Sequence, residues 1–168
     1  GLPGMGFSII RKTVLEKCQG NAHSLSLDLY EQCKSMDANK QWRFTPPIHI
    51  IASFDSAIRQ YEAAGGQPGR YKRYDNNRRI LTEGMRAMGF ETLLSDNLQA
   101  PIIVTFKMPA DEAFVFDDFY DQLKDRGYII YPGKLTVAPS FRIGCIGALD
   151  ESHMHGALEA VKTILNEM

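Results

Sequence analysis

A single charged residue interrupts the β-like run Phe141-Arg142-Ile143-Gly144-Cys145-Ile146-Gly147. Side chains alternate between the two faces of a strand, so Arg142 is expected on the face opposite Phe141 and Ile143. Its guanidinium presents a rigid fork of N–H groups that matches a carboxylate or a phosphate. Two interpretations follow: Arg142 binds the anionic group of a ligand, or it forms a structural ion pair with an Asp or Glu of a neighbouring helix.

The elements around this run predict a compact α/β unit over residues 99–168. Its expected order is strand, helix, strand, strand, helix. Gly127 is expected to follow the end of the first of these helices, and Asp150 to cap the second. The expected strands are 101–107, 128–131 and 141–146, and the helices are 116–126 and about 151–168.

Residues 1–98 have a different pattern, with helices but almost no sheet. We expect a strand at 6–11, a short helix at 13–17 capped by Thr13, a segment that becomes helical near Met36, and long helices at 47–64 and 68–88. One strand with long helices is an incomplete layer. We therefore expect a domain boundary between residues 98 and 99, and a packing partner outside this chain or in another subunit.

Thr45-Pro46-Pro47 precedes the first long helix. Threonine is a good N-cap, and proline fits the first helical turn because its missing N–H has no partner there anyway. The same arrangement, a hydroxyl beside free helix N–H groups, also suits a phosphate. Capping and phosphate binding both remain open on these residues alone.

Charge and composition exclude several classes of function. The formal net charge of −1 gives no general attraction to nucleic acid or to an acidic membrane, and no apolar run approaches the length of a membrane span. The three cysteines have no metal-like spacing, and His153 and His155 lie two apart on a helix, so they cannot easily share a metal. We expect a cytoplasmic protein with reduced thiols, with no nucleic-acid, membrane or metal partner.

Several separated motifs resemble, in family order, the class V pyridoxal-phosphate aminotransferases of fold type I. The resemblance is strongest to the branch of 2-aminoethylphosphonate–pyruvate transaminases. The motifs are Gly1-Leu2-Pro3-Gly4-Met5-Gly6-Phe7, Ser24-Leu25-Ser26-Leu27-Asp28-Leu29-Tyr30, Trp42-Arg43-Phe44-Thr45-Pro46-Pro47-Ile48-His49, Gly84-Met85-Arg86-Ala87-Met88-Gly89-Phe90-Glu91-Thr92-Leu93-Leu94, Tyr131-Pro132-Gly133-Lys134 and Phe141-Arg142-Ile143-Gly144-Cys145-Ile146-Gly147.

The resemblance implies a fold and an activity. Residues 1–98 would be the tail of the large domain that binds pyridoxal 5'-phosphate, with its long linking helices, and residues 99–168 the small C-terminal α/β domain. The intact protein would be a homodimer that transfers the amino group of 2-aminoethylphosphonate to pyruvate in phosphonate degradation.

The resemblance also implies roles for three residues of this chain. Arg142 matches the arginine that holds the acidic group of the substrate. Thr45 matches the threonine whose hydroxyl reaches the cofactor phosphate, typically the phosphate bound by the other subunit, and Trp42 matches an aromatic residue near that phosphate.

Several family features are absent from the sequence: the lysine of the Schiff base, the aspartate that partners the pyridine nitrogen of the cofactor, the aromatic residue that stacks on its ring, and the main phosphate loop. The lysine that forms the Schiff base with the cofactor lies, in the family, a few residues before the motif that opens this chain at Gly1. Lys12 and Lys17 follow that motif and a strand, so neither can replace it. We therefore expect the chain to be the C-terminal half of the enzyme, with no catalytic residue of its own and no activity alone.

Two other functions remain open. Residues 99–168 resemble half of many ligand-binding folds, so a non-enzymatic small-molecule binding module is one alternative. Another class V chemistry is the second: alanine–glyoxylate or serine–pyruvate transamination, or cysteine desulfuration. Desulfuration needs a mobile, nucleophilic cysteine, and Cys145 lies in a strand that is expected to be buried.

Overall fold

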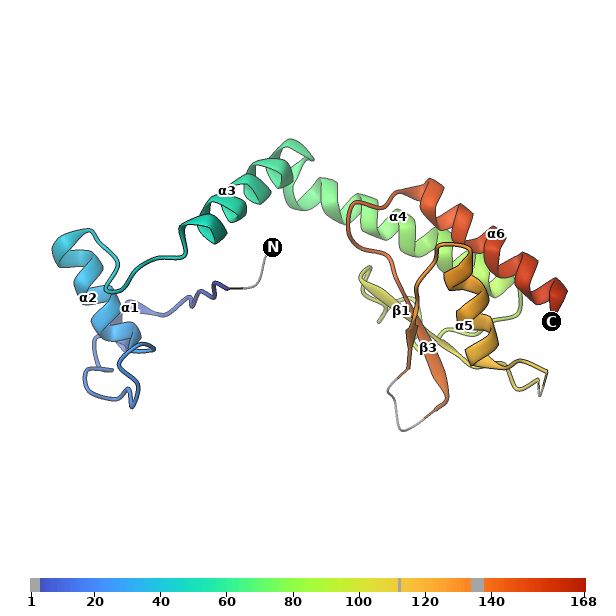
Figure 1. Cartoon of the computed structure of the whole chain (residues 1–168), viewed down its shortest axis with the longest axis horizontal. Coiled ribbons are helices and arrows are strands. Elements are labelled where there is room, and N and C mark those ends of the chain that lie inside the picture. The colour runs from blue at the N-terminus through green and yellow to red at the C-terminus, as the bar shows by residue number, and fades with distance from the viewer. Residues whose placement is uncertain (1–3, 112, 134–137) are drawn as a thin grey trace. The chain divides into compact units, whose positions relative to one another are not determined.

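The computed structural model describes residues 4–111, 113–133 and 138–168, and Figure 1 shows its elements. The chain divides into two compact units, Gly1–Ala63 and Ala64–Met168, and each is described by itself. The expected boundary between residues 98 and 99 refers to the domains of the longer family fold, and it stays a prediction. Among the described residues, no helix combines the length and the apolar character that crossing a bilayer needs.

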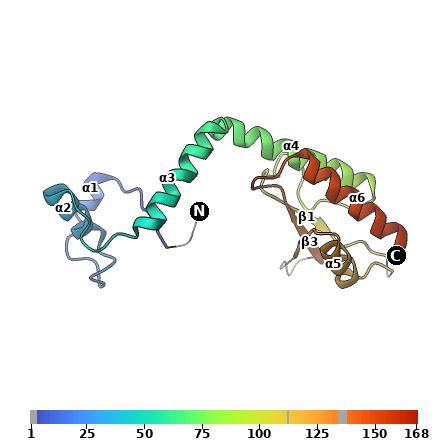
Figure 2. The same cartoon turned by 45° about the horizontal axis from the view of Figure 1, so that its top comes forward.

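The second unit has a three-stranded antiparallel sheet in the order β1-β3-β2, with helices packed against it. Helices α4 and α6 lie side by side in both views (Figures 1 and 2). The predicted order of strands and helices is therefore confirmed for this unit. The elements are α4 (Gly66–Ala87), β1 (Ile103–Lys107), α5 (Phe116–Asp125), β2 (Tyr131–Pro132), β3 (Ser140–Gly144) and α6 (Glu151–Glu167).

The predicted strand over residues 128–131 is shorter in the structure, where only Tyr131 and Pro132 pair with β3. The reason lies at the end of α5. Gly127 has a φ of 89°, and the Tyr128 N–H donates to the carbonyl of Leu123, which closes the helix. This bond keeps Tyr128 beside the helix, so the chain reaches the sheet only at Tyr131.

The core of the second unit is a cluster of phenylalanine rings between the sheet and the helices. Phe141 of β3 is fully buried, and its ring centroid lies 5.6 Å from that of Phe90, 5.7 Å from that of Phe106 and 5.6 Å from that of Phe119. Ring pairs at such separations add about 0.5–1.5 kcal/mol each beyond the area they bury. This cluster determines which face of the sheet the helices cover.

The ends of α4 and α6 follow the expected signals. After α4, Gly89 has a φ of 92°, and the Phe90 N–H donates to the carbonyl of Met85. Asp150 caps α6, because its carboxylate accepts from the backbone N–H of Ser152. Hydrogen bonds from Ser152 and His153 lower the pKa of Asp150 to about 2.

The first unit contains α1 (Lys12–Leu15), α2 (Leu29–Asn39) and α3 (Ile48–Ala63), and none of its described residues is fully buried. The strand predicted at 6–11 is wrong: the segment is irregular, with Ile9 95% exposed. A strand needs a partner for its backbone groups, and the described part of this unit holds no other strand. The absence of buried residues in this unit is what an incomplete layer would show, but it concerns residues 4–63 alone, because α4 packs against α6 and β1 within the second unit.

Two helix starts in the first unit also differ from the sequence-based expectation. Thr13 lies inside α1, whose N-cap is Arg11, so its predicted capping role is wrong. Helix α2 begins at Leu29, well before Met36, because the side chain of Asp28 accepts from the backbone N–H of Glu31.

The close contact between α4 and α6 at Gly84 can be tested by mutation. A Cβ at Gly84 would lie 2.4 Å from Cδ1 of Leu158, so this glycine lets the two helices approach. We expect Gly84→Ala to lower the free energy of unfolding by about 1–3 kcal/mol in the wild-type background. In a Leu158→Ala background it should raise that free energy by about 0.5–1 kcal/mol, because alanine favours helix over glycine. Urea titration of the four proteins measures both changes, and equal effects in the two backgrounds would contradict this account.

Candidate functional site

Arg142 lies in the middle of β3, on the sheet face away from the phenylalanine cluster. Its neighbours Phe141 and Ile143 are buried in the core, whereas Arg142 is half-buried. The alternation predicted from the sequence is therefore confirmed. Arg142 pairs in register with Thr105 of β1 on one side and with Tyr131 of β2 on the other.

The guanidinium of Arg142 forms few hydrogen bonds within the described residues. Its Nη2 donates one long hydrogen bond, 3.4 Å, to the carbonyl of Pro132, and its buried Nε has no hydrogen-bond partner. The structural ion-pair interpretation finds no Asp or Glu partner in the described part of the chain. Within the described residues most donors of this half-buried cation are unused, and a guanidinium in that state is chemically suited to an anion.

Side chains of α4 hold the segment that follows β3. The buried Asn77 amide donates to the carbonyls of Cys145 and Leu149, at 3.2 and 3.0 Å. Arg73 donates to the carbonyl of Gly147 and Tyr74 accepts from its N–H. These residues position the end of the strand that carries Arg142, and sequence reasoning missed them. The available signal was the polar Asn77, which lies four residues before Leu81 and therefore on the same face of the helix.

A close approach of two backbones defines the other side of the site. The Gly133 N–H donates to the carbonyl of Ser140 at 2.7 Å. A Cβ at Gly133 would lie 2.2 Å from that oxygen, so only glycine fits here. The motif Tyr131-Pro132-Gly133 therefore serves to seat β2 against β3. Lys134, the last residue of that motif, is outside the described residues, as are Gly1 to Pro3 of the opening motif.

Trp42 and Thr45 lie together in the first unit, on the loop before α3. The loop forms an open hollow lined by residues 40–46. Thr45 does not cap α3 as expected: the helix begins three residues later, at Ile48, and the Ile48 N–H donates to the carbonyl of Pro46. The Thr45 side chain is exposed and, among the described residues, its hydroxyl has no hydrogen-bond partner. The alternative of plain capping is thus not supported.

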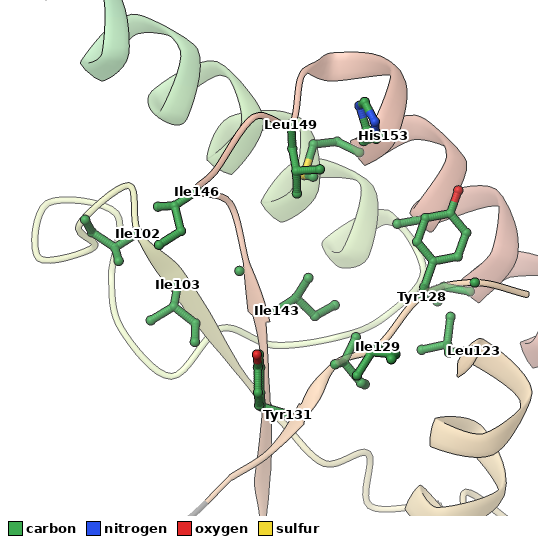
Figure 3. A pocket seen from close by; sticks show the side chains of 16 residues that line it. Ile102, Ile103, Leu123, Tyr128, Ile129, Tyr131, Ile143, Ile146, Leu149 and His153 are labelled. Atoms are coloured by element: carbon green, nitrogen blue, oxygen red, sulfur yellow. The ribbon is translucent and has the colours of Figure 1, made fainter. Parts of the chain in front are cut away.

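An apolar pocket of about 520 Å³ opens where β2 diverges from β3. Figure 3 shows Ile103, Ile129, Ile143 and Tyr131 around it, with Tyr131 reaching in from β2. Most of its lining is hydrocarbon, so it does not itself suit a small anion. Arg142 is not among the residues that line it.

Comparison with known proteins shows strong similarity along the whole chain. A 2-aminoethylphosphonate–pyruvate transaminase of Cupriavidus pinatubonensis is 52% identical over all 168 residues, which are 44% of its own length. The corresponding enzymes of Cupriavidus taiwanensis and Pseudomonas putida are 51% and 48% identical over the same 168 residues. The chain is homologous to these transaminases. It spans about 45% of their length, at their C-terminal end. No family model matches the chain.

Solved structures of aminotransferases share the fold. The pyridoxamine–pyruvate aminotransferase of Mesorhizobium loti has a TM-score of 0.77 at 20% identity, over 94% of this chain and 41% of that one. The ureidoglycine–glyoxylate aminotransferase of Bacillus subtilis has a TM-score of 0.74 at 18% identity, over 92% of this chain and 40% of that one. The fold predicted from the resemblance, the C-terminal part of a fold type I aminotransferase, is thereby confirmed.

Cys145 bears on the desulfuration alternative within the class V family. The residue is fully buried, and this burial raises the pKa of its thiol to about 11, against a smaller lowering effect of the Arg78 charge. Only about one thiol in a thousand would be ionised at pH 8 with such a pKa. A buried, protonated thiol is a poor nucleophile, as expected from the sequence.

Alkylation tests the state of Cys145. We expect iodoacetamide at pH 8 to leave Cys145 unmodified in the folded protein and to modify it after unfolding in urea, because only unfolding exposes the thiol and restores its usual pKa. Peptide mass spectrometry measures the modified fraction at each cysteine. Equal labelling of Cys145 in the two states would contradict the burial argument.

Proposed function

We propose that the chain is the C-terminal part of an aminotransferase that moves the amino group of 2-aminoethylphosphonate to pyruvate. The donor becomes phosphonoacetaldehyde and the acceptor becomes alanine. The observation that supports this most is the identity of about 50% to transaminases of that name along the entire chain. The guanidinium of Arg142 has no acidic partner among the described residues, which agrees with the proposal because both substrates end in an anion.

Arg142 is the proposed substrate-binding residue. The phosphonate of the donor and the carboxylate of the acceptor would each take the place that no side chain of the described residues fills. Two parallel hydrogen bonds to the fork fix the direction of the substrate as well as its position. Such orientation supplies a large part of a rate enhancement, since the reacting carbon is then held in one place.

The proposed cofactor is pyridoxal 5'-phosphate, which supplies an electron sink for the transfer of the amino group. Residues of the first unit fit its phosphate in part. The exposed Thr45 hydroxyl has no protein partner among the described residues, and the half-exposed Trp42 lies in the same hollow. Thr45 would donate to a phosphate oxygen, and Trp42 would shield that phosphate from water.

The first unit has no fully buried residue among those described, which agrees with a partner surface in the intact protein. We propose a homodimer in which Thr45 reaches the cofactor phosphate of the other subunit. We also propose that the enzyme is cytoplasmic and acts on small molecules, with no nucleic-acid or membrane partner. The lysine that holds the cofactor would lie in the preceding part of the protein, so the chain alone is expected to be inactive.

Replacement of Arg142 tests the proposed substrate site. In the product of the complete reading frame, Arg142→Ala should lower kcat/KM by about a hundredfold or more for 2-aminoethylphosphonate and for pyruvate, because each loses its charged partner. Arg126→Ala is a matched control, since Arg126 forms a surface ion pair with Glu167. For the unmodified protein, alanine and serine as donors and glyoxylate as acceptor should give lower kcat/KM values than 2-aminoethylphosphonate and pyruvate. If the Arg142→Ala protein keeps its kcat/KM for both substrates, Arg142 is not the substrate-binding residue.

Replacement of Thr45 tests the proposed phosphate contact. Thr45→Val should weaken the binding of pyridoxal 5'-phosphate by about tenfold, because one hydrogen bond to a charged group is lost. Equilibrium dialysis followed by cofactor absorbance measures the dissociation constant without an activity assay. Thr13→Val is the control on the same unit, and equal cofactor affinity of all three proteins would argue against the contact.

A further inference from the structure

Three side chains form one row across the sheet. Tyr131 of β2, Arg142 of β3 and Thr105 of β1 are direct partners in the strand register. Directly paired residues of antiparallel strands project from the same face, within reach of each other. The row therefore places a tyrosine and a threonine on the strands that flank Arg142, on the face that the phenylalanine cluster does not occupy.

Neither hydroxyl forms a hydrogen bond with another described residue. Tyr131 is 56% exposed and Thr105 is half-buried, and within the described residues neither hydroxyl has a hydrogen-bond partner. Tyr128, by contrast, points elsewhere: its hydroxyl lies against Gly156 of α6. Among the described residues, the row thus has two neutral donors without partners beside one cation without an acidic partner.

Arg142 is the cation nearest to the two hydroxyl residues in the strand register, and the other described cation on this sheet face, Lys107, already has an acidic partner. Lys107, in the next row, lies 2.7 Å from the carboxylate of Glu91 and is neutralised by it. Its partner in the register, Ser140, is buried with an unpartnered hydroxyl oxygen. In the row on the other side, Ile103 pairs with Gly144, and both line the apolar pocket that Tyr131 also borders (Figure 3). Apolar walls on this side strengthen hydrogen bonds to a charged group, because fewer water molecules compete for it.

The two substrate anions differ in a way that the row can distinguish. A carboxylate has two oxygens, and the guanidinium fork binds both. A phosphonate has three oxygens in a tetrahedral arrangement, so a fork that binds two leaves one without a donor. Leaving a charged acceptor unpaired in a desolvated site is costly, and a hydroxyl in reach removes that cost.

We propose that Tyr131 and Thr105 are specificity-determining residues that both donate to the phosphonate oxygen that Arg142 leaves without a donor. They make the site favour a phosphonate, while the carboxylate depends on Arg142 alone. This inference rests on the proposed function, because it assumes that Arg142 binds the anionic end of the substrates.

Binding of two unreactive anions tests the inference directly. Ethylphosphonate and propionate have the same carbon chain and differ only in the anionic group. Titration calorimetry with the complete, cofactor-loaded protein should show that Tyr131→Phe and Thr105→Val each weaken ethylphosphonate binding by about tenfold. Binding of propionate should change by less than about twofold, because its two oxygens stay on Arg142. Thr105→Ser keeps a hydroxyl and should restore ethylphosphonate binding.

Tyr128→Phe is the matched control, and it should leave both affinities unchanged because that hydroxyl faces α6. The ratio of kcat/KM for 2-aminoethylphosphonate to that for pyruvate gives a second readout, which should fall about tenfold in Tyr131→Phe and in Thr105→Val. Circular dichroism of each variant checks that it is folded.

The outcomes separate this inference from the proposed function. If Tyr131→Phe and Thr105→Val weaken both anions equally, or neither, the specificity role is overturned, although Arg142 can still be the anion site. If Arg142→Ala leaves both anions and both kcat/KM values unchanged, the proposed substrate site itself is overturned, and the inference is overturned with it.

Discussion

Burial of the Phe141 ring is the constraint on which the second unit depends. The ring is enclosed by those of Phe90, Phe106 and Phe119, which come from three other segments of the chain. Burying it fixes the face of β3 that meets the helices, and strand alternation then places Arg142 on the opposite face. A shift of one residue in register would bury the guanidinium and expose the ring, so hydrophobic packing holds the cation in place without touching it.

Helix α4 gives the sheet its second support. It precedes the strands in the sequence, yet its Asn77 amide binds two carbonyls of the segment that follows β3, and its Gly84 admits α6 at close range. A buried amide that lost these carbonyls would pay the full cost of its desolvation. The end of β3 is therefore held by groups more than 60 residues away in sequence, which is why local patterns could not indicate them.

The two proposed sites differ in how much of their surroundings the chain contains. Arg142 stands in a packed sheet whose neighbours in register are all described, so its unused donors can be compared with those of Thr105 and Tyr131. Thr45 and Trp42 lie on a loop of a unit without a fully buried residue. The role proposed for them would need surfaces from outside the described residues, and the similarity to transaminases of more than twice the length of this chain agrees with that.

The sequence by itself determined the elements whose signals are local. The long helices, the glycines that end α4 and α5, the Asp150 cap and the face of Arg142 could all be predicted from neighbouring residues, because helical period, strand alternation and capping act over a few positions. The family resemblance came from several separate motifs in a fixed order along the chain. The resemblance also identified the unused Arg142 and Thr45 as candidates, which residue patterns alone left undecided.

Only the tertiary structure decided the features that depend on distant partners. The apolar segment 6–11 is not a strand because no partner strand lies beside it in the described part of its unit, and residues 128–130 leave the sheet because α5 retains Tyr128. The row of Tyr131, Arg142 and Thr105 exists only through the register of three strands that are separated in sequence. Strand pairing is a contact between remote segments, so its register is set by packing and backbone hydrogen bonds across the sheet, and not by the residues of any one strand.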